Sequence, residues 1–261
     1  MNTIETMLQN FIGALERPVD ERDWPLSDVP PPTLVPPGFK PNIYNQGSIE
    51  PSCGAGACAT LENFNNPGAI VSMQYIWIQN RLLDGLPASS GSDMRTLFKA
   101  LQNSGSCDES LLEANVQEPI EQYVSPTNIT QALVLNAMPR RINFYGFQYG
   151  PFTWTGLQQT VNLYHVVLAR INLGTRFYTN ANGAYSYSPA DIFPLQLGTY
   201  VDDHFIVLIS QDLAKIYGIE NPNPNFQYFI NDWGSQYGQD GVGWFDATYL
   251  PHIVEIGAVS K

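Results

Sequence analysis

The chain has 261 residues, of which 14% are charged and 12% aromatic, and it contains 20 prolines and 21 glycines. This composition is typical of a folded, loop-rich protein with enough core for one large domain or two packed lobes, and it excludes a disordered chain. The formal net charge of -12, with only 12 Lys and Arg residues, predicts that neither nucleic acid nor an anionic membrane is a partner.

Three features of the sequence bear on its compartment. No apolar run approaches the ~18 residues of a membrane-spanning helix. Residues 1–22 contain Asp and Glu and lack the apolar stretch of a secretory signal. The three cysteines form no even disulfide framework, which indicates a reducing environment. We therefore expect a cytoplasmic protein, and the sequence leaves its oligomeric state open.

The first 42 residues are expected to form an N-terminal arm. Residues 2–16 carry apolar side chains at helical spacing, which predicts a short amphipathic helix. Residues 23–42 contain seven prolines, and such a segment is expected to be extended. The favoured interpretation is an arm packed across the surface. The alternative is an inhibitory segment that lies in the cleft of the site described below.

The stretch from Asn45 to Ala59 organises the interpretation of the whole chain. It begins as a loop with Gly and Pro and continues as small residues typical of a helix, which Pro67 ends. Cys53 lies on the first helical turn, where unpaired backbone N–H groups and the helix dipole favour an anion. A thiolate there has a lowered pKa and is a nucleophile at neutral pH. A buried structural cysteine is the alternative interpretation.

The residues that follow are also predicted to be helical. Ser72 caps a helix within residues 70–82. A loop at 87–93 then leads to a helix over 94–102 that Gly105 ends.

The second half of the chain is predicted to be rich in strands. Residues 111–140 are expected to be irregular, and a short helix is expected at 157–163. Alternating and apolar runs predict strands at 141–147, 165–171, 204–210, 226–231 and 242–247. The fold class is therefore α+β with two lobes, a helical lobe over 43–139 and a β-rich lobe over 140–261, with the site in the cleft between them.

Two later motifs give Cys53 a chemical context. His204 stands at the head of an apolar strand, and Asn231 begins the run Asn-Asp-Trp-Gly. With Gln46 upstream of the Cys, the order Gln, Cys, His, Asn resembles the papain family of cysteine peptidases, in which the His and Asn follow the Cys at roughly this distance. The helices and the Ser-Gly loop of residues 70–102 resemble the bacterial branch of that family. The resemblance implies a papain-like two-lobe fold, hydrolysis of peptide bonds in a polypeptide substrate, and no cofactor or metal.

The resemblance also assigns roles to individual residues. Cys53 attacks the substrate carbonyl, His204 accepts and later donates the proton, and the side-chain oxygen of Asn231 fixes the ring tautomer. The Gln46 amide and the backbone N–H of the nucleophile are the donors to the oxyanion. Trp233 would shield the His–Asn contact from water.

Three further positions are candidates for substrate binding, together with Trp233. The backbone around Gly91 is expected to pair with an extended substrate, and Met94 is expected to border a pocket for a substrate side chain. Asp203, directly before the His, is the third candidate.

The nucleophile position has two candidates. In the family the oxyanion Gln lies six residues before the Cys, and here the sixth residue after Gln46 is Ser52, with Cys53 one further on. A match at Cys53 requires an insertion in the preceding loop, which costs little, and a loss within the helix, which turns its face. A Ser lacks the low pKa of a thiol, so Cys53 is preferred and Ser52 is kept as the alternative. Cys58 is interpreted as a small core residue.

Three functions remain open at this point. The first is a papain-type cysteine peptidase. The second is an inactive or Ser-substituted relative that serves as a binding or structural module. The third is an acyl-transfer enzyme, such as a transglutaminase-like protein, on another fold. The Asn-Asp-Trp-Gly run favours the first two, and the reactivity of a thiol separates them.

Overall fold

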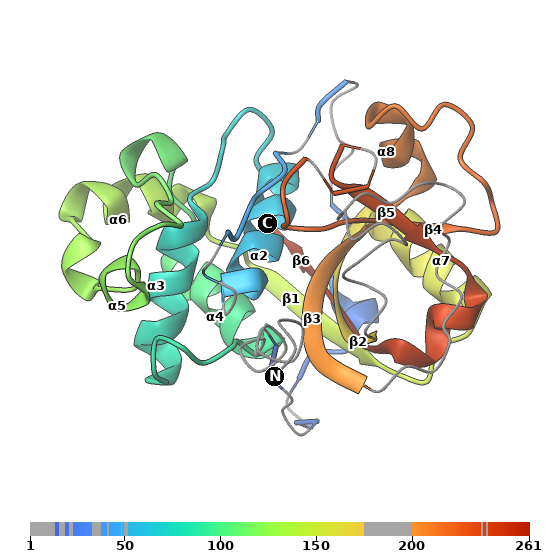
Figure 1. Ribbon diagram of the computed structural model, residues 1–261, viewed down its shortest axis with the longest axis horizontal. Coiled ribbons are helices and arrows are strands. Elements are labelled where there is room, and N and C mark those ends of the chain that lie inside the picture. Colours follow the sequence, from blue (N-terminus) through green and yellow to red (C-terminus); the bar gives the residue numbers. More distant parts are fainter. Residues whose placement is uncertain are drawn as a thin grey trace, which may run out of the picture.

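A computed structural model describes residues 14–15, 19–20, 23–32, 38–40, 42–47, 49, 52–174, 200–235, 237–238 and 240–261. Helices occupy one side of the molecule and an antiparallel sheet the other, with α2 between them (Figure 1). The α+β fold class predicted from the sequence is confirmed. Among the helices of the described residues, none is both long and apolar enough to cross a bilayer.

Within the described residues, the helical side is built from five α-helices and several short 3-10 turns. The α-helices are α2 (Cys53–Asn65), α3 (Met73–Asp84), α4 (Met94–Ser104), α5 (Ile120–Tyr123) and α6 (Gln131–Ala137). The 3-10 turns on this side are η3 (Glu109–Leu111), η4 (Pro126–Asn128) and η5 (Met138–Arg140). A further 3-10 turn, η1 (Leu26–Asp28), packs against the sheet instead. Side-chain caps start three of the helices, because the side chains of Ser72, Asp93 and Thr130 accept hydrogen bonds from the first turns of α3, α4 and α6.

In the part of the chain that the structure describes, the β-rich side is one six-stranded antiparallel sheet in the order β1-β6-β2-β3-β4-β5. The strands are β1 (Phe144–Tyr149), β2 (Val166–Gly174), β3 (Tyr200–Ile209), β4 (Gln227–Ile230), β5 (Val242–Phe245) and β6 (Ile253–Ser260). The helices α7 (Trp154–Tyr164), α8 (Gln211–Ile216) and η8 (Ala247–His252) connect them.

The helix α2 is buried along almost its whole length and joins the two halves. Its side chains belong to a core cluster that also includes residues of α3, α4 and the sheet. Gly54 makes the close approach possible, because a Cβ there would lie 2.6 Å from Leu97 Cδ1 and 3.1 Å from Phe205 Cδ2. A second cluster on the other face of the sheet packs against α7 and η8.

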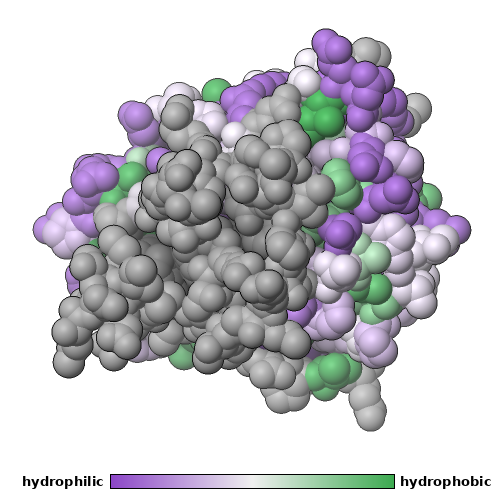
Figure 2. Space-filling view, turned by 45° about the vertical axis from the view of Figure 1, so that its right-hand side comes forward, coloured by the Kyte–Doolittle hydropathy of each residue, from purple (hydrophilic) through white to green (hydrophobic). Residues whose placement is uncertain are grey.

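Most exposed large apolar side chains of the described residues are scattered, and Leu82 and Leu83 on α3 are an adjacent pair. On the face in Figure 2 the described part is mainly hydrophilic, with apolar residues as separate spots. Exposed large apolar residues such as Ile70, Leu135 and Leu163 come from different elements. Scattered exposure of this kind is ordinary for a folded protein.

The structure corrects three predictions of secondary structure. Residues 111–140 are not irregular, since they contain α5, α6 and the 3-10 turns η4 and η5. The strand β6 was not predicted, because seven of its eight residues are buried and its pattern does not alternate. The predicted helix at 2–16 does not extend to Ala14, which forms a β-bridge, and residues 2–13 and 16 lie outside the described residues. The predicted helix start next to Ser52 is confirmed, since α2 begins at Cys53.

Gly105 provides a test of how the helical side is packed. Its φ is +74°, and a Cβ there would lie 2.1 Å from the carbonyl oxygen of Ala137 at the end of α6. We expect Gly105→Ala to lower the free energy of unfolding by about 3–5 kcal/mol, measured by urea denaturation, since backbone strain and a backbone clash add. Gly68→Ala is the matched control. Its φ is +92° with no atom within 4 Å of a Cβ, so only strain of about 1–2 kcal/mol applies. Equal losses in the two variants would contradict the packing described here.

Candidate active site

His204 and Asn231 form a buried hydrogen bond at the centre of the site. His204 lies on β3, and Asn231 directly follows β4, which pairs with β3. The distance between His204 Nε2 and Asn231 Oδ1 is 2.9 Å. Since an amide oxygen only accepts hydrogen bonds, Nε2 carries the proton and Nδ1 is the basic nitrogen of the ring. The contact expected from the sequence is therefore present.

Asn231 is itself held in place by the backbone. Its Oδ1 also accepts the backbone N–H of Asp232 at 2.9 Å, and its own backbone N–H donates to the carbonyl of Gly241 at 3.1 Å. Its side-chain nitrogen is buried and has no hydrogen-bond partner among the described residues. The orientation of the amide is thus set by what its oxygen accepts.

Trp233 lies over the imidazole. The centroids of the Trp233 and His204 rings are 5.4 Å apart, and the Trp233 ring packs edge-on against Tyr237. Trp233 therefore covers the His204 imidazole, as expected for a residue that shields the contact between His204 and Asn231 from water.

A short backbone ladder brings Gln46 to this site. Asn45 and Trp233 form an antiparallel bridge, and the N–H of Gln46 donates to the carbonyl of Asp232 at 2.8 Å. The N–H of Gly234 donates to the carbonyl of Tyr44 at 2.9 Å. The segment that leads into α2 is in this way fixed beside the residues that follow β4.

The Gln46 side chain contacts Asp232, a residue for which no role was predicted. With its amide nitrogen facing Asp232, Nε2 lies 3.0 Å from Oδ2 and 3.1 Å from Oδ1. Both carboxylate oxygens are acceptors, so the end of the amide that faces them is the donor end. Asp232 Oδ1 is also 3.7 Å from His204 Nε2. The sequence feature that could have indicated a role for Asp232 is its position between Asn231 and Trp233.

Burial changes the protonation of both titratable groups. It lowers the pKa of His204 to about 4, against the opposing effect of the hydrogen bond to Asn231. It raises the pKa of Asp232 well above its usual range. Both effects have one cause, since removal from water disfavours the charged form of each group.

Ser52 and Cys53 lie together at the N-terminus of α2, and both are fully buried. Ser52 directly precedes the helix, and its hydroxyl donates to the carbonyl of Ile49 at 2.6 Å. Cys53 is the first helical residue and belongs to the core cluster. Gly56 faces the site, because a Cβ there would lie 2.6 Å from Asp232 Oδ2. Cys53 and Ser52, three and four residues before Gly56, lie on the same face of the helix, so the geometry of α2 is compatible with either residue as the nucleophile.

The other two cysteines are also buried. The pKa of Cys58 is raised well above its usual range by burial and by the nearby Glu62 carboxylate. Burial also raises the pKa of Cys107, to about 12. Both thiols therefore stay protonated and weakly nucleophilic at neutral pH.

An extended segment of the chain itself lies next to the His. The N–H of Ala14 donates to the carbonyl of Asp203 at 3.2 Å, and the N–H of Leu15 donates to the carbonyl of Ser92 at 2.7 Å. Ala14 is also bridged in parallel to Ser92. Part of the N-terminal arm thus lies between the loop before α4 and the strand that carries His204.

The structure places the candidate substrate-binding residues in different environments. The carbonyl of Gly91 accepts a hydrogen bond from the Arg81 guanidinium at 2.9 Å, so the pairing with an extended chain is seen at the next residue, Ser92. Met94 is buried in the core, against Gly257 of β6. The Asp203 carboxylate binds Arg170 at 2.7 Å, and that guanidinium also binds Glu255 at 2.9 Å.

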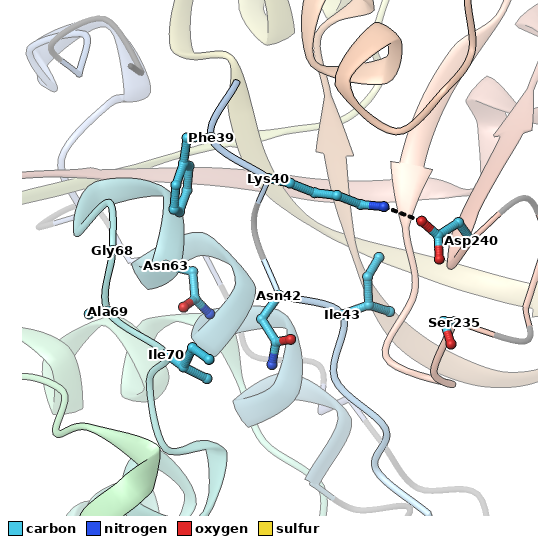
Figure 3. A pocket seen from close by; sticks show the side chains of 10 residues that line it. All are labelled: Phe39, Lys40, Asn42, Ile43, Asn63, Gly68, Ala69, Ile70, Ser235 and Asp240. Atoms are coloured by element: carbon cyan, nitrogen blue, oxygen red, sulfur yellow. Dashed lines mark hydrogen bonds and ion pairs between the residues drawn. The ribbon is translucent and has the colours of Figure 1, made fainter. Parts of the chain in front are cut away.

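A pocket of about 450 Å³ lies elsewhere (Figure 3). It is lined by residues before Gln46, by the end of α2 and the loop after it, and by Ser235 and Asp240. An ion pair between Lys40 and Asp240 crosses it. None of the candidate catalytic residues lines this pocket, and Asn63 on its wall is about 15 Å along α2 from Cys53.

Comparison with solved structures shows that the fold is that of the papain-like cysteine proteases. Xylellain, a cysteine protease from Xylella fastidiosa, superposes with a TM-score of 0.71 at 18% identity, over 97% of this chain and 96% of that one. Digestive procathepsin L 3 of Tenebrio molitor gives a TM-score of 0.60 at 13% identity, over 99% and 79% of the two chains.

A third solved structure shows the same fold. The cysteine protease of Carica candamarcensis, solved in complex with E-64, has a TM-score of 0.60 at 14% identity, over 86% of this chain and 94% of that one. No protein-family model matches the sequence, and no curated protein sequence matches it. At these identities the comparisons establish the fold.

The low pKa of His204 predicts a specific dependence of stability on pH. Between pH 6.5 and 4 the unfolded chain binds a proton at this position that the folded protein does not, so stability falls as the pH is lowered through that range. We expect this to amount to about 2 kcal/mol between pH 7 and pH 4.5. The measurement is the difference in unfolding free energy between wild type and His204→Gln at pH 7 and at pH 4.5. The variant is needed because buried Asp232 and Glu62, with raised pKa values, contribute the opposite slope. A difference that does not change with pH would contradict the burial of His204.

Proposed function

We propose that this protein is a papain-type cysteine peptidase that hydrolyses peptide bonds with Cys53 as nucleophile, His204 as base and acid, and Asn231 as the residue that orients His204. The observation that carries the proposal is the bond between His204 Nε2 and Asn231 Oδ1, which makes Nδ1 the basic nitrogen. A peptidase needs this tautomer, because Nδ1 can then take a proton from the nucleophile and return it to the leaving group.

The chemistry follows from these positions. The Cys53 sulfur forms a bond to the substrate carbonyl carbon as its proton passes to His204 Nδ1, and the π electrons of the carbonyl move to its oxygen. His204 then protonates the leaving amine as the C–N bond breaks, which leaves a thioester. Water attacks the thioester with His204 as base, the C–S bond breaks, and the thiol regains its proton.

Two features stabilise the negative charges that form during this reaction, on the thiolate and on the oxyanion. The first turn of α2 presents unpaired N–H groups and the positive end of the helix dipole to a thiolate at Cys53. The negative oxygen of the tetrahedral intermediate needs hydrogen-bond donors, for which the Gln46 amide and the backbone N–H of Cys53 are the candidates. The neutral form that burial favours for His204 is the form that a general base requires.

The N-terminal arm supports a polypeptide as the substrate. The backbone N–H groups of Ala14 and Leu15 donate to the carbonyls of Asp203 and Ser92 respectively, and Asp203 directly precedes His204. These are acceptors that any extended peptide can use, whatever its side chains. The same contacts favour the interpretation of the arm as a segment that lies in the cleft.

A second candidate function is that of a Ser-substituted or inactive papain homologue that serves as a binding or structural module. Its support is the position of Ser52, six residues after Gln46 and four before Gly56, which faces Asp232. A Ser at the nucleophile position would lack the thiolate on which the mechanism above depends.

Thiol labelling separates the two functions. Iodoacetamide at about pH 6, well below the ordinary thiol pKa of roughly 8.5, is expected to label Cys53 at least tenfold faster than Cys58 or Cys107, as mapped by mass spectrometry. The slower thiols are internal controls, because burial raises their pKa values. His204→Ala should slow the labelling of Cys53.

Peptide hydrolysis gives the second part of the test. With a fluorogenic peptide library as substrate, Cys53→Ala should abolish turnover and Ser52→Ala should leave most of it. If instead Ser52→Ala abolishes turnover, the nucleophile is Ser52. If Cys53 reacts no faster than Cys107 and no peptide is cleaved, the chain is an inactive homologue.

A further inference from the structure

Asp232 is a buried carboxyl group in the middle of the site. No Lys or Arg of the described residues lies within 4 Å of its oxygens, whereas the buried carboxylates of Asp203 and Glu255 share Arg170. A buried carboxyl group is costly unless its hydrogen-bonding capacity is used. The groups that use the Asp232 oxygens therefore indicate what this residue does.

The main partner of the Asp232 side chain is the Gln46 amide. The amide nitrogen lies 3.0 and 3.1 Å from the two oxygens, and the backbones of the two residues are joined by a separate hydrogen bond of 2.8 Å. Gly56 provides the space, since a Cβ on α2 at this position would meet Asp232 Oδ2 at 2.6 Å and Asp232 Cβ at 3.0 Å. Three segments of the chain are thus fitted around one contact.

A primary amide has two N–H bonds in one plane, about 120° apart. When one of them is held by Asp232, the direction of the other is fixed as well. A donor that is already oriented requires no reorganisation when negative charge develops on a substrate oxygen. The contact therefore has a consequence for catalysis beyond the burial of two polar groups.

We propose that Asp232 is a positioning residue whose carboxyl group fixes the Gln46 amide, so that the second N–H of the amide is presented to the carbonyl oxygen of the scissile peptide bond. This inference rests on the proposed peptidase function. Burial raises the pKa of Asp232, but a protonated carboxyl group keeps an acceptor oxygen, so the contact persists in either form.

The contact itself can be tested without any measurement of activity. In ¹⁵N-labelled full-length protein, the Gln46 side-chain amide signals are assigned by their loss in Gln46→Ala. We expect one of its two protons to be shifted downfield and to exchange slowly with solvent in the wild type. Asp232→Ala should abolish both properties, and Asp232→Asn, which keeps an oxygen acceptor, should retain them in part. Glu62→Gln is the matched control, since it removes a buried carboxylate on α2 that binds Ser106 and Asn66 instead.

The kinetic test asks whether Asp232 acts through Gln46. Loss of an oxyanion donor in Gln46→Ala should lower kcat by about 100-fold or more, with little change in KM. Asp232→Ala should lower kcat at least tenfold, and the double variant should lie within about threefold of Gln46→Ala alone, because the second change removes nothing further. Thermal unfolding of each variant checks that it is folded, and Glu62→Gln should keep the wild-type kcat.

Each outcome is decisive. An unchanged Gln46 amide in Asp232→Ala, or kcat losses that multiply in the double variant, would overturn the positioning role. A wild type without peptide hydrolysis would defeat the proposed function, and the amide signals would still decide whether Asp232 holds Gln46.

Discussion

The short ladder between residues 44–46 and 232–234 is the interaction on which the site depends. It consists of a bridge at Asn45 and Trp233 with hydrogen bonds on either side. The segment on one side leads within a few residues into α2, and the segment on the other side follows directly from Asn231. The start of the buried helix and the end of β4 are therefore fixed to each other through a handful of backbone atoms, across more than half of the chain length.

The second constraint is the exclusion of water from the polar groups that the ladder gathers. His204, Asn231, Asp232 and Gln46 are all buried. A neutral imidazole is the form favoured in such an environment, and every change of charge during a reaction would have to be offset by a nearby partner. The Asn231 oxygen, the Asp232 carboxyl group and the N-terminus of α2 are the local sources of such compensation.

Much of this arrangement could be predicted from the sequence, for reasons that differ between residues. The helices that begin after Ser52, Ser72 and Asp93 have local signals at their starts, and a capping interaction needs only neighbouring residues. The contact of His204 with Asn231 could be expected because a Gln, Cys, His, Asn order is specific when its parts occur together.

The remaining features depend on contacts between distant segments, which a local sequence pattern does not predict. The strand β6 lies inside the sheet, so side chains on both of its faces are buried and its alternation is lost. No sequence pattern assigns a role to Asp232, which acquires its partner only because the ladder places Gln46 beside it. The choice between Ser52 and Cys53 involves a shift of one residue at a helix start, which is finer than sequence patterns resolve.

The way in which Arg81 holds the loop before α4 bears on which side chains of that loop can vary. Its guanidinium, stacked over Trp77, donates to the carbonyls of Pro87, Ser90 and Gly91 at 3.1, 2.9 and 2.9 Å. These bonds grip main-chain atoms alone, so the side chains at 88–90, which are exposed or half-buried, can be exchanged while the Ser92 carbonyl keeps its position. Substitutions at positions 88–90 can therefore change the side chains of this loop without moving the Ser92 carbonyl, which accepts the hydrogen bond from Leu15.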